Sequence, residues 1–469
     1  MRSIVLMAAL AGCAAKAAPA PVAPVSDARE ILRRAAHRRW QAPPSIAPDL
    51  VRSISDEVGP RLAGSPGDAR AVAWGLRTMR TLGFSNVRAE PVRVPHWERG
   101  VERGELTGNY ARPVALTALG GSVGTPPEGI EAEVVEVTSL DALEALPEAS
   151  ARGRIVYVHG VMRRTRDGSG YGDAVPVRGR SASIAARKGA LAVIIRSVGT
   201  DRTRAPHTGQ LRYDDAAPRI PAAALSTADG DSLHRLIAMG GDPVRFRLTL
   251  GCRALPESDS ANVVGEVPGS DLAREVVLLG AHLDSWDLGT GALDDGAGVA
   301  IVLSTAKRLM TERPPRRTVR VVLFANEENG IAGARAYAAQ HRDELAQHVV
   351  ALEADAGDGR VYAARYAGAE EGRAAYHRVV EHLASMGVRV SDERAHGGAD
   401  LSPLVPAGVP RMDLSQDMSR YFDVHHTVND TPAELDERAI NQAVAVWAAA
   451  VGELASMDET FGRAPVDAH

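Results

Sequence analysis

Residues 276–279 are Val276-Val277-Leu278-Leu279, a continuous apolar run that is typical of a parallel strand buried on both faces. Helix-like and strand-like segments alternate after it. We expect helices over 296–310, 332–341 and 440–454, and strands over 319–324 and 349–352. This strand–helix–strand order predicts an α/β fold with an open, mostly parallel sheet and helices on both of its faces.

Polar side chains follow each expected strand at its carboxyl end, which is where open α/β sheets bind their ligands. They are His282 and Asp284, then Glu327 and Glu328, then Asp355, and the loop that enters the first helix adds Asp294 and Asp295. So many anions on one rim repel one another unless cations lie among them. Because the candidates are His, Asp and Glu, the expected cation is zinc.

The residue types on this rim indicate two ions. The carboxylate of Asp294 can bridge both with its two oxygens, and each ion keeps an open position for a shared water. Glu327 directly precedes the candidate ligand Glu328 and is left to take a proton from that water. Asp284 lies two residues after His282 and can accept the other N–H of the imidazole, which fixes its tautomer.

Four motifs around these residues resemble those of the M28 zinc peptidases. They are His282-Leu-Asp284, Gly291-Ala-Leu-Asp294-Asp295-Gly296, Asn326-Glu327-Glu328 and His426-Thr-Val-Asn-Asp430-Thr431. The resemblance implies two zinc ions per subunit, with ligands at His282, Asp294, Glu328, Asp355 and His426. It also implies a general base at Glu327, an orienting Asp284, a cis bond between Asp294 and Asp295, and a homodimer.

Residues 106–255 differ from the rest of the chain. Short strand-like runs at 130–137, 154–158, 191–196, 222–225 and 244–250 are separated by Gly, Pro and Asp, with a helix pattern at 180–188. This β-rich segment resembles a protease-associated (PA) domain, on Gly153-Arg-Ile-Val-Tyr-Val158, Lys188-Gly189-Ala190 and Ile220-Pro221-Ala222. No paired carboxylates or histidine clusters stand out in it. We expect a lid or specificity module inserted into a peptidase domain formed by residues 27–105 and 256–469.

Several side chains near the motifs allow two interpretations each. His425 competes with its neighbour His426 as a ligand and is otherwise a packing or substrate neighbour. Tyr421 is either an oxyanion-stabilising group or a core tyrosine. His207 either reaches the catalytic rim or is an exposed loop histidine. Asp400 either faces the substrate or belongs to a turn.

The amino terminus has the order of an export signal. Arg2 precedes the apolar run 4–10, and Leu10-Ala11-Gly12-Cys13 resembles the lipobox of bacterial lipoproteins, in which the cysteine is lipidated. A signal peptide cut near Ala18 and a merely Ala-rich start are the alternatives. Residues 14–26 are rich in Ala and Pro, which predicts a flexible stalk. The protein is therefore expected to be exported and held at the cell envelope by a lipid anchor, on the periplasmic side of the outer membrane, or to be secreted.

Composition excludes one class of partner. With 469 residues the chain is too long for one ordinary core, so at least two domains are expected. A net charge of −5 without a basic block, and only 4% aromatic residues, argue against nucleic-acid binding. The expected function is hydrolysis of dipeptides or short peptides. The alternatives are an aminopeptidase that acts on longer peptides and, in another class, a glutaminyl cyclase with one zinc.

Overall fold

A computed structural model describes residues 42–312 and 314–465. The predicted signal with Cys13 and the stalk at 14–26 lie outside the described residues. Within the described part of the chain, no helix combines the length and the apolar character that crossing a membrane requires.

The main sheet has eight strands, and its parallel part lies at the centre. Its spatial order is β1 (Ser85–Glu98), β10 (Arg253–Val267), β12 (Arg317–Phe324), β11 (Leu272–His282), β13 (His348–Glu353), β16 (Arg411–Gln416), β14 (Val361–Ala367) and β15 (Arg389–Arg394). Strands β12, β11, β13 and β16 run parallel to one another, whereas β10 and β14 pair with them in antiparallel fashion.

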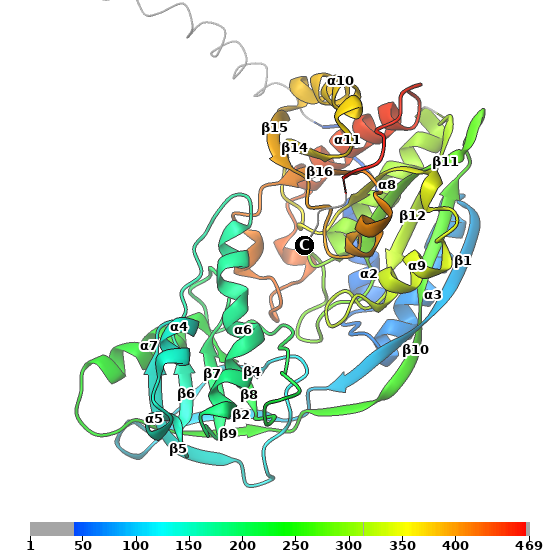
Figure 1. The fold of residues 1–469 in the computed structure, drawn as a ribbon. Coiled ribbons are helices and arrows are strands. Elements are labelled where there is room, and N and C mark those ends of the chain that lie inside the picture. Colours follow the sequence, from blue (N-terminus) through cyan, green and yellow to red (C-terminus); the bar gives the residue numbers. More distant parts are fainter. Residues whose placement is uncertain (1–41, 313, 466–469) are drawn as a thin grey trace, which may run out of the picture. The chain divides into compact units, whose positions relative to one another are not determined.

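Helices cover both faces of the main sheet because its central strands are apolar on both sides (Figure 1). Val277 and Leu279 of β11 belong to the same core as α2 (Ala47–Glu57), α8 (Gly296–Glu312) and α11 (Glu437–Leu454). Leu278 points to the opposite face and packs in the core that contains Tyr337 of α9 (Ala332–Gln340). The remaining helices of this region are α3 (Pro66–Leu82) and α10 (Arg373–Leu383).

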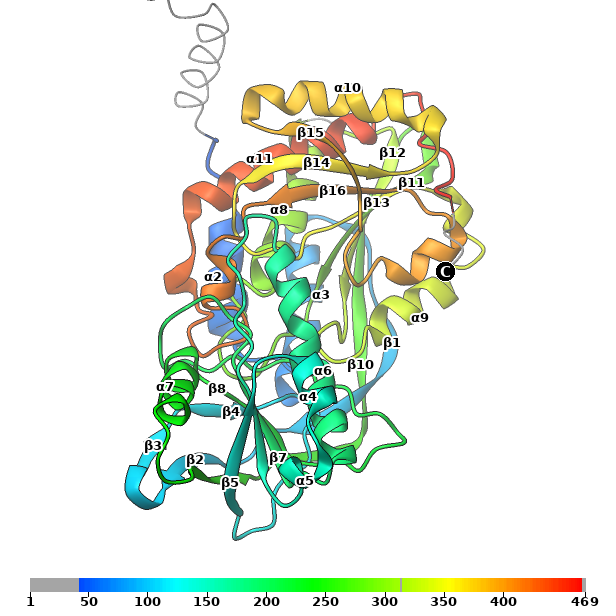
Figure 2. The same cartoon turned by 60° about the vertical axis from the view of Figure 1, so that its left-hand side comes forward.

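A second eight-stranded sheet is built from residues 102–250, which we call the inserted segment. Its order is β3 (Arg112–Val114), β2 (Glu102–Thr107), β9 (Arg245–Leu250), β5 (Ile130–Val137), β6 (Ile155–Val158), β7 (Ala192–Arg196), β8 (Ala222–Leu225) and β4 (Leu116–Ala118). Its helices are α4 (Leu140–Ala145), α5 (Glu148–Ala151), α6 (Ser169–Arg187) and α7 (Thr227–Ala238). The chain enters it from β1 and leaves it into β10, and these two strands pair along their length (Figure 2).

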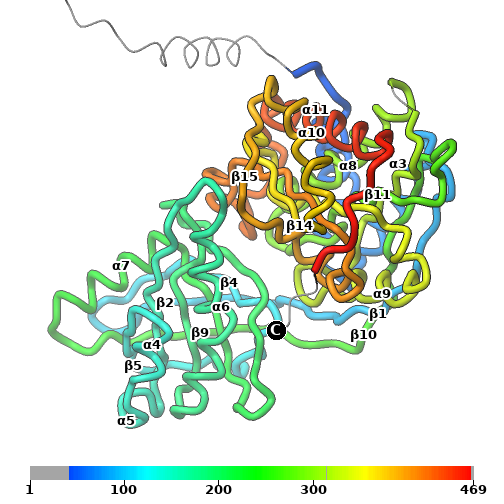
Figure 3. Tube along the Cα trace, turned by 45° about the horizontal axis from the view of Figure 1, so that its top comes forward, coloured from blue at the N-terminus to red at the C-terminus, as the bar shows by residue number. Residues whose placement is uncertain are grey.

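The predicted fold class, α/β with sheets flanked by helices, is confirmed. The helix expected over 180–188 is only the second half of α6, which begins at Ser169. Its first half contains Pro176 together with Gly170 and Gly172, residues that disfavour a helix in sequence-based reasoning. The alternation of helices and strands in residues 361–394 was also not anticipated. The tube in Figure 3 shows that these elements, β14, α10 and β15, lie together at one edge of the main sheet.

Candidate active site

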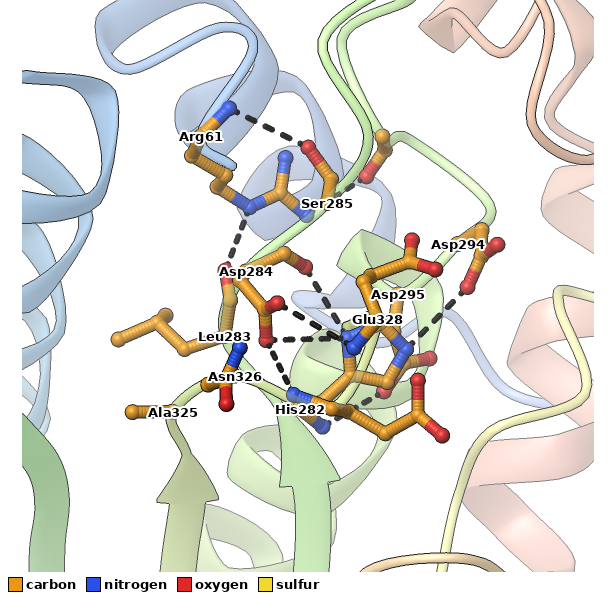
Figure 4. Close-up of polar contacts among 12 residues, drawn as sticks. Arg61, His282, Leu283, Asp284, Ser285, Asp294, Asp295, Ala325, Asn326 and Glu328 are labelled. Carbon is orange, nitrogen blue, oxygen red and sulfur yellow. Dashed lines mark hydrogen bonds and ion pairs between the residues drawn. The ribbon is translucent and has the colours of Figure 1, made fainter. Parts of the chain in front are cut away.

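The candidate site forms where three neighbouring strands of the main sheet end. The register pairs His282 of β11 with Phe324 of β12, and Gly280 of β11 with Glu353 of β13. The residues that follow these strand ends are therefore neighbours in space. They bring His282, the pair Glu327 and Glu328, and Asp355 to one edge of the sheet, as predicted (Figure 4 for His282 and Glu328).

Asp294 lies at the centre of this group, and its two oxygens face different partners. Oδ1 lies 3.2 Å from Nε2 of His282, and that nitrogen lies 3.6 Å from Oδ1 of Asp355. Oδ2 lies 3.1 Å from Nε2 of His426, which is 2.9 Å from Oε2 of Glu328. The peptide bond between Asp294 and Asp295 is cis, as the resemblance implied.

His425 stacks on His426, with ring centroids 3.5 Å apart. Its Nε2 is 3.4 Å from Oδ2 of Asp294, so both histidines approach the same carboxylate oxygen. Only His426 also has an ion-pair distance to Glu328. Two groups of three residues have donor atoms close enough to hold an ion here: His282, Asp294 and Asp355, and Asp294, His425 and His426.

Two further aspartates fix the geometry around His282. The carboxylate of Asp284 accepts backbone hydrogen bonds from Glu327 (2.9 Å) and Glu328 (3.4 Å), and its Oδ1 is 3.7 Å from Nδ1 of His282. The same nitrogen lies 3.0 Å from the backbone oxygen of Asp284. Asp295 accepts the N–H of His282 (3.1 Å) and the N–H of Gly298 in the first turn of α8 (3.0 Å). Asp295 thus holds the start of α8 against the end of β11.

Sequence reasoning assigned no role to Arg61, which is fully buried behind the site. Its guanidinium donates to the backbone oxygens of Leu283 (2.7 Å), Thr290 (2.6 Å) and Gly291 (2.8 Å), so it holds both ends of the loop between His282 and Asp294 (Figure 4 shows Arg61 and Leu283). Asp430 also supports the loop, because its carboxylate accepts the N–H groups of Leu293 and Asp294. The motif around Asp430 was visible in the sequence, but these backbone contacts were not.

The acids of the site strongly perturb one another. Burial raises the pKa of Glu327 well above its ordinary value, and Asp355 and Glu328 raise it further although His282 opposes them. Burial lowers the pKa of the His282 imidazole, but contacts with Asp294 and Asp355 outweigh it, so this pKa is well above the usual one. Buried carboxylates in such excess over cationic side chains are unfavourable unless a further cation is present.

A cavity of about 1050 Å³ lies beside these groups. Its lining includes Asp294, Glu327, Glu328, Asp355, His425 and His426 from the site, and Tyr171, Arg178, Arg180, Gln210 and Arg212 from the inserted segment. Nη1 of the buried Arg178 has no hydrogen-bond partner among the described residues, and the same holds for Oε1 of Gln210. These arginines are 70 or more positions away from the motifs in the chain, so the sequence alone does not place them beside the site.

The other candidates lie in different places. Tyr421 is buried, lines the cavity and packs against the ring of His425. His207 is buried rather than exposed in a loop: its Nδ1 donates to the backbone oxygen of His425 (2.7 Å) and its Nε2 lies 2.9 Å from Asp201. Asp400 is fully buried, and neither of its carboxylate oxygens has a hydrogen-bond partner among the described residues.

Comparison with known proteins agrees with this arrangement. Residues 262–451 match the model of peptidase family M28. Human carboxypeptidase Q is 38% identical over 414 residues, which cover 87% of this chain and 85% of that protein. The chain belongs to peptidase family M28.

Solved structures extend the comparison to the fold of this M28 peptidase. A peptidase M28 precursor from Shewanella amazonensis is 41% identical, with a TM-score of 0.88, over 94% of this chain and 99% of that one. A zinc aminopeptidase from Bacillus subtilis shares the fold at 20% identity, with a TM-score of 0.64 over 89% of this chain and 97% of that one. Its family and its relatives therefore make the protein a metallo-exopeptidase of the carboxypeptidase or aminopeptidase type.

The donor set of this M28 peptidase fits zinc. Oδ2 of Asp294 is buried and makes no hydrogen bond to residues 42–312 or 314–465, although two imidazole nitrogens face it at 3.1 and 3.4 Å. Buried polar atoms without a partner are rare in proteins, and a bound ion is one of the explanations for them. Imidazole and carboxylate donors converging in a buried place are the ligands that zinc takes.

Proposed function

We propose that this peptidase hydrolyses dipeptides and other short peptides at a dinuclear zinc site. The observation that carries the proposal is the position of Asp294. Each of its oxygens faces a separate pair made of one histidine and one carboxylate: His282 with Asp355, and His426 with Glu328. A bridging carboxylate between two such ligand sets is the arrangement that two metal ions need. Zinc bound by these five residues would acidify a water molecule and polarise the scissile carbonyl.

Glu327 is the proposed general base. Its backbone N–H is held by Asp284, whereas its side chain lines the cavity, so the carboxylate can reach a water molecule there. In the proposed reaction a carboxylate oxygen of Glu327 takes a proton from the attacking water. The same oxygen then gives this proton to the nitrogen of the leaving amine, and the amide C–N bond breaks.

The inserted segment supports a preference for short peptides with a free carboxyl terminus. We propose that it acts as a PA domain that covers the cavity, since Arg178, Arg180 and Arg212 line the same cavity as the proposed zinc ligands. A guanidinium is the group best suited to bind a carboxylate, and Nη1 of Arg178 has no hydrogen-bond partner in the described part of the chain. A substrate carboxylate placed beside this nitrogen would accept the hydrogen bond that it does not make in the structure.

A panel of free, N-blocked and C-blocked dipeptides tests the substrate class. We expect free and N-blocked dipeptides to be cleaved, whereas C-blocked ones lose at least about ten-fold in kcat/KM because Arg178 loses its charged partner. Preferential cleavage of C-blocked peptides and long chains would instead establish the aminopeptidase alternative. The zinc content of the active protein tests the metal site: two ions per chain support the proposal, and one supports the glutaminyl cyclase alternative.

Three predictions concern the whole protein and stay predictions: export, lipidation of Cys13 and a homodimer. Mass spectrometry of the mature amino terminus decides the first two, because a lipidated cysteine would be its first residue. Sedimentation velocity decides the third.

A further inference from the structure

We propose that Arg99 is a positioning residue for two of the proposed zinc ligands, Glu328 and His426, and that it makes the binding of one zinc ion depend on the inserted segment. The inference rests on the proposed dinuclear site and concerns how that site is held in place. Arg99 lies between β1 and β2, where the chain enters the inserted segment. Its side chain is only 10% exposed, and arginines are rarely buried to this degree unless they are paired.

The guanidinium of Arg99 has an acceptor for each of its nitrogens. Nε and Nη2 donate to the two carboxylate oxygens of Asp287, at 2.8 and 2.5 Å. Nη1 donates to Oγ1 of Thr117 and to the backbone oxygen of Ala118, both at 2.7 Å and both on β4. Nη2 also donates to Oγ1 of Thr208 at 3.2 Å. Arg99 therefore joins the loop between β11 and α8, which contains Asp287, to two parts of the inserted segment.

The contact with Asp287 extends to the ligand Glu328. Asp287 directly follows Trp286, whose backbone N–H donates to Oε1 of Glu328 at 3.2 Å. The other oxygen, Oε2, lies 2.9 Å from Nε2 of His426. The Trp286 ring makes edge-to-face contacts with the rings of Trp97 and His426, at centroid distances of 6.4 and 5.8 Å. Because a bidentate ion pair fixes the position of Asp287, it also fixes the neighbouring N–H that orients Glu328.

The contact with Thr208 extends to the ligand His426. The backbone N–H of Thr208 donates to the backbone oxygen of His426 at 3.0 Å, and its backbone oxygen lies 3.4 Å from Nδ1 of the same residue. A backbone oxygen at the far nitrogen is a usual support of a metal-binding histidine, because it selects the tautomer whose other nitrogen can bind the ion. The Thr208 hydroxyl accepts from Arg99 and donates to the backbone oxygen of Ala118 at 2.8 Å. Arg99 therefore helps to hold the residue that holds His426.

The other pair of proposed ligands, His282 with Asp355, is supported in a different way. His282 is held by Asp284 and Asp295, which lie close to it in the chain. Neither of these contacts involves the inserted segment. Loss of Arg99 should therefore weaken the binding of one zinc ion and leave that of the other unchanged.

Stepwise removal of zinc from the full-length holoenzyme tests the proposal. The wild type and Arg99→Met are incubated with increasing concentrations of a chelator, and emission spectrometry counts the zinc that remains per chain. We expect the wild type to hold two ions, and the variant to bind one of them about 10–100-fold more weakly while the other is unchanged. Arg93→Met removes a β1 arginine that is 55% exposed, and this control should retain zinc as the wild type does.

Two further variants make the result specific. Thr208→Val keeps the shape of the side chain but cannot accept a hydrogen bond from Arg99, so it should weaken the same ion. This variant decides the question where Arg99→Met does not fold. Glu328→Ala lacks a proposed ligand of that ion, so adding Arg99→Met to it should leave the affinity for the remaining ion unchanged.

Two results would overturn the proposal: unchanged affinity for both ions in Arg99→Met, and equal weakening of both ions, which a merely structural role of Arg99 predicts. In the case that Arg99→Met does not fold, the same two results in Thr208→Val would overturn it. A single zinc ion per chain in the wild type is a different result, because it contradicts the dinuclear site itself and with it any selective effect of Arg99.

Discussion

Glu327 is the residue on which the proposed chemistry depends most directly. Its neighbour Glu328 is positioned by contacts with His426 and Trp286, whereas the Glu327 side chain faces the cavity. In Glu327→Gln the side chain keeps its size but can no longer take a proton. We expect kcat to fall by about 10²–10⁴-fold while the zinc content stays unchanged. Steady-state kinetics with metal analysis measures both, and Glu371→Gln at an exposed position is the control. Near wild-type turnover in Glu327→Gln would rule out its role as base.

At the same scale, the sequence could predict side chains that follow strand ends, but not those that come from elsewhere. His282, Glu327, Glu328 and Asp355 follow three strands that the apolar runs identify, so their meeting at one edge follows from the rule for parallel sheets. Arg61 and Arg178 reach the site only because the chain returns to it. Arg61 donates to backbone oxygens, whereas Arg178 donates to the Tyr171 hydroxyl and lines the cavity. Contacts of these kinds leave no pattern in the sequence.

At the scale of elements, the loop between β11 and α8 depends on Arg61. Three backbone oxygens at the two ends of this loop accept hydrogen bonds from one guanidinium in the protein interior. Arg61→Met has a similar volume but leaves these oxygens buried and unpaired. We expect a loss of about 3 kcal/mol or more in the free energy of unfolding, and lower activity because Asp294 loses its fixed position. Urea unfolding measures the first effect, and Arg80→Met on the exposed face of α3 is the control. An unchanged unfolding midpoint in Arg61→Met would contradict the structural role.

Elements were predictable where their apolar pattern is strong. The strands at 130–137 and 222–225 have the predicted bounds, and the helix expected over 440–454 is α11 with one extra turn at its start. The first half of α6 was hidden because Pro176 and its neighbouring glycines lower helix propensity, whereas stacking of Tyr171 on Phe422, 4.8 Å between ring centroids, supports this half in the structure. The exposed β15 has no alternating apolar pattern and could not have been found by periodicity.

For the molecule as a whole, the inserted segment positions part of the candidate zinc site. His207 donates to the backbone oxygen of His425, and the N–H of Thr208 donates to that of His426 at 3.0 Å. His426 has a φ of 61°, a conformation that costs energy for a residue other than glycine and needs support from its surroundings.

We expect His207→Ala to lower kcat about ten-fold, because the backbone oxygen of His425 loses its hydrogen-bond donor. His207→Asn can keep an N–H donor to this oxygen and should retain most of the wild-type kcat. Circular dichroism checks that both variants are folded. Equal kcat in the alanine variant and the wild type would show that the contact is not needed for catalysis.

The stability of the whole chain should depend on pH through His348, which is 1% exposed at the start of β13. Its Nδ1 donates to the backbone oxygen of Glu344 and its Nε2 accepts from the Tyr337 hydroxyl, so the neutral ring fits its place. Burial lowers the pKa of His348 to about 4, whereas an unfolded chain has an ordinary histidine pKa. Between these two values the unfolded chain binds a proton that the folded chain does not. The stability that the neutral His348 contributes is therefore complete above about pH 6.5, and about 3 kcal/mol of it is lost as the pH falls to about 4.

Urea unfolding of the wild type and of His348→Gln at a series of pH values tests this prediction. Both proteins are kept in chelator so that zinc loss does not contribute. The free energy of unfolding of the variant should fall less steeply than that of the wild type in this pH range. Parallel pH profiles for the two proteins would mean that His348 is not the group responsible.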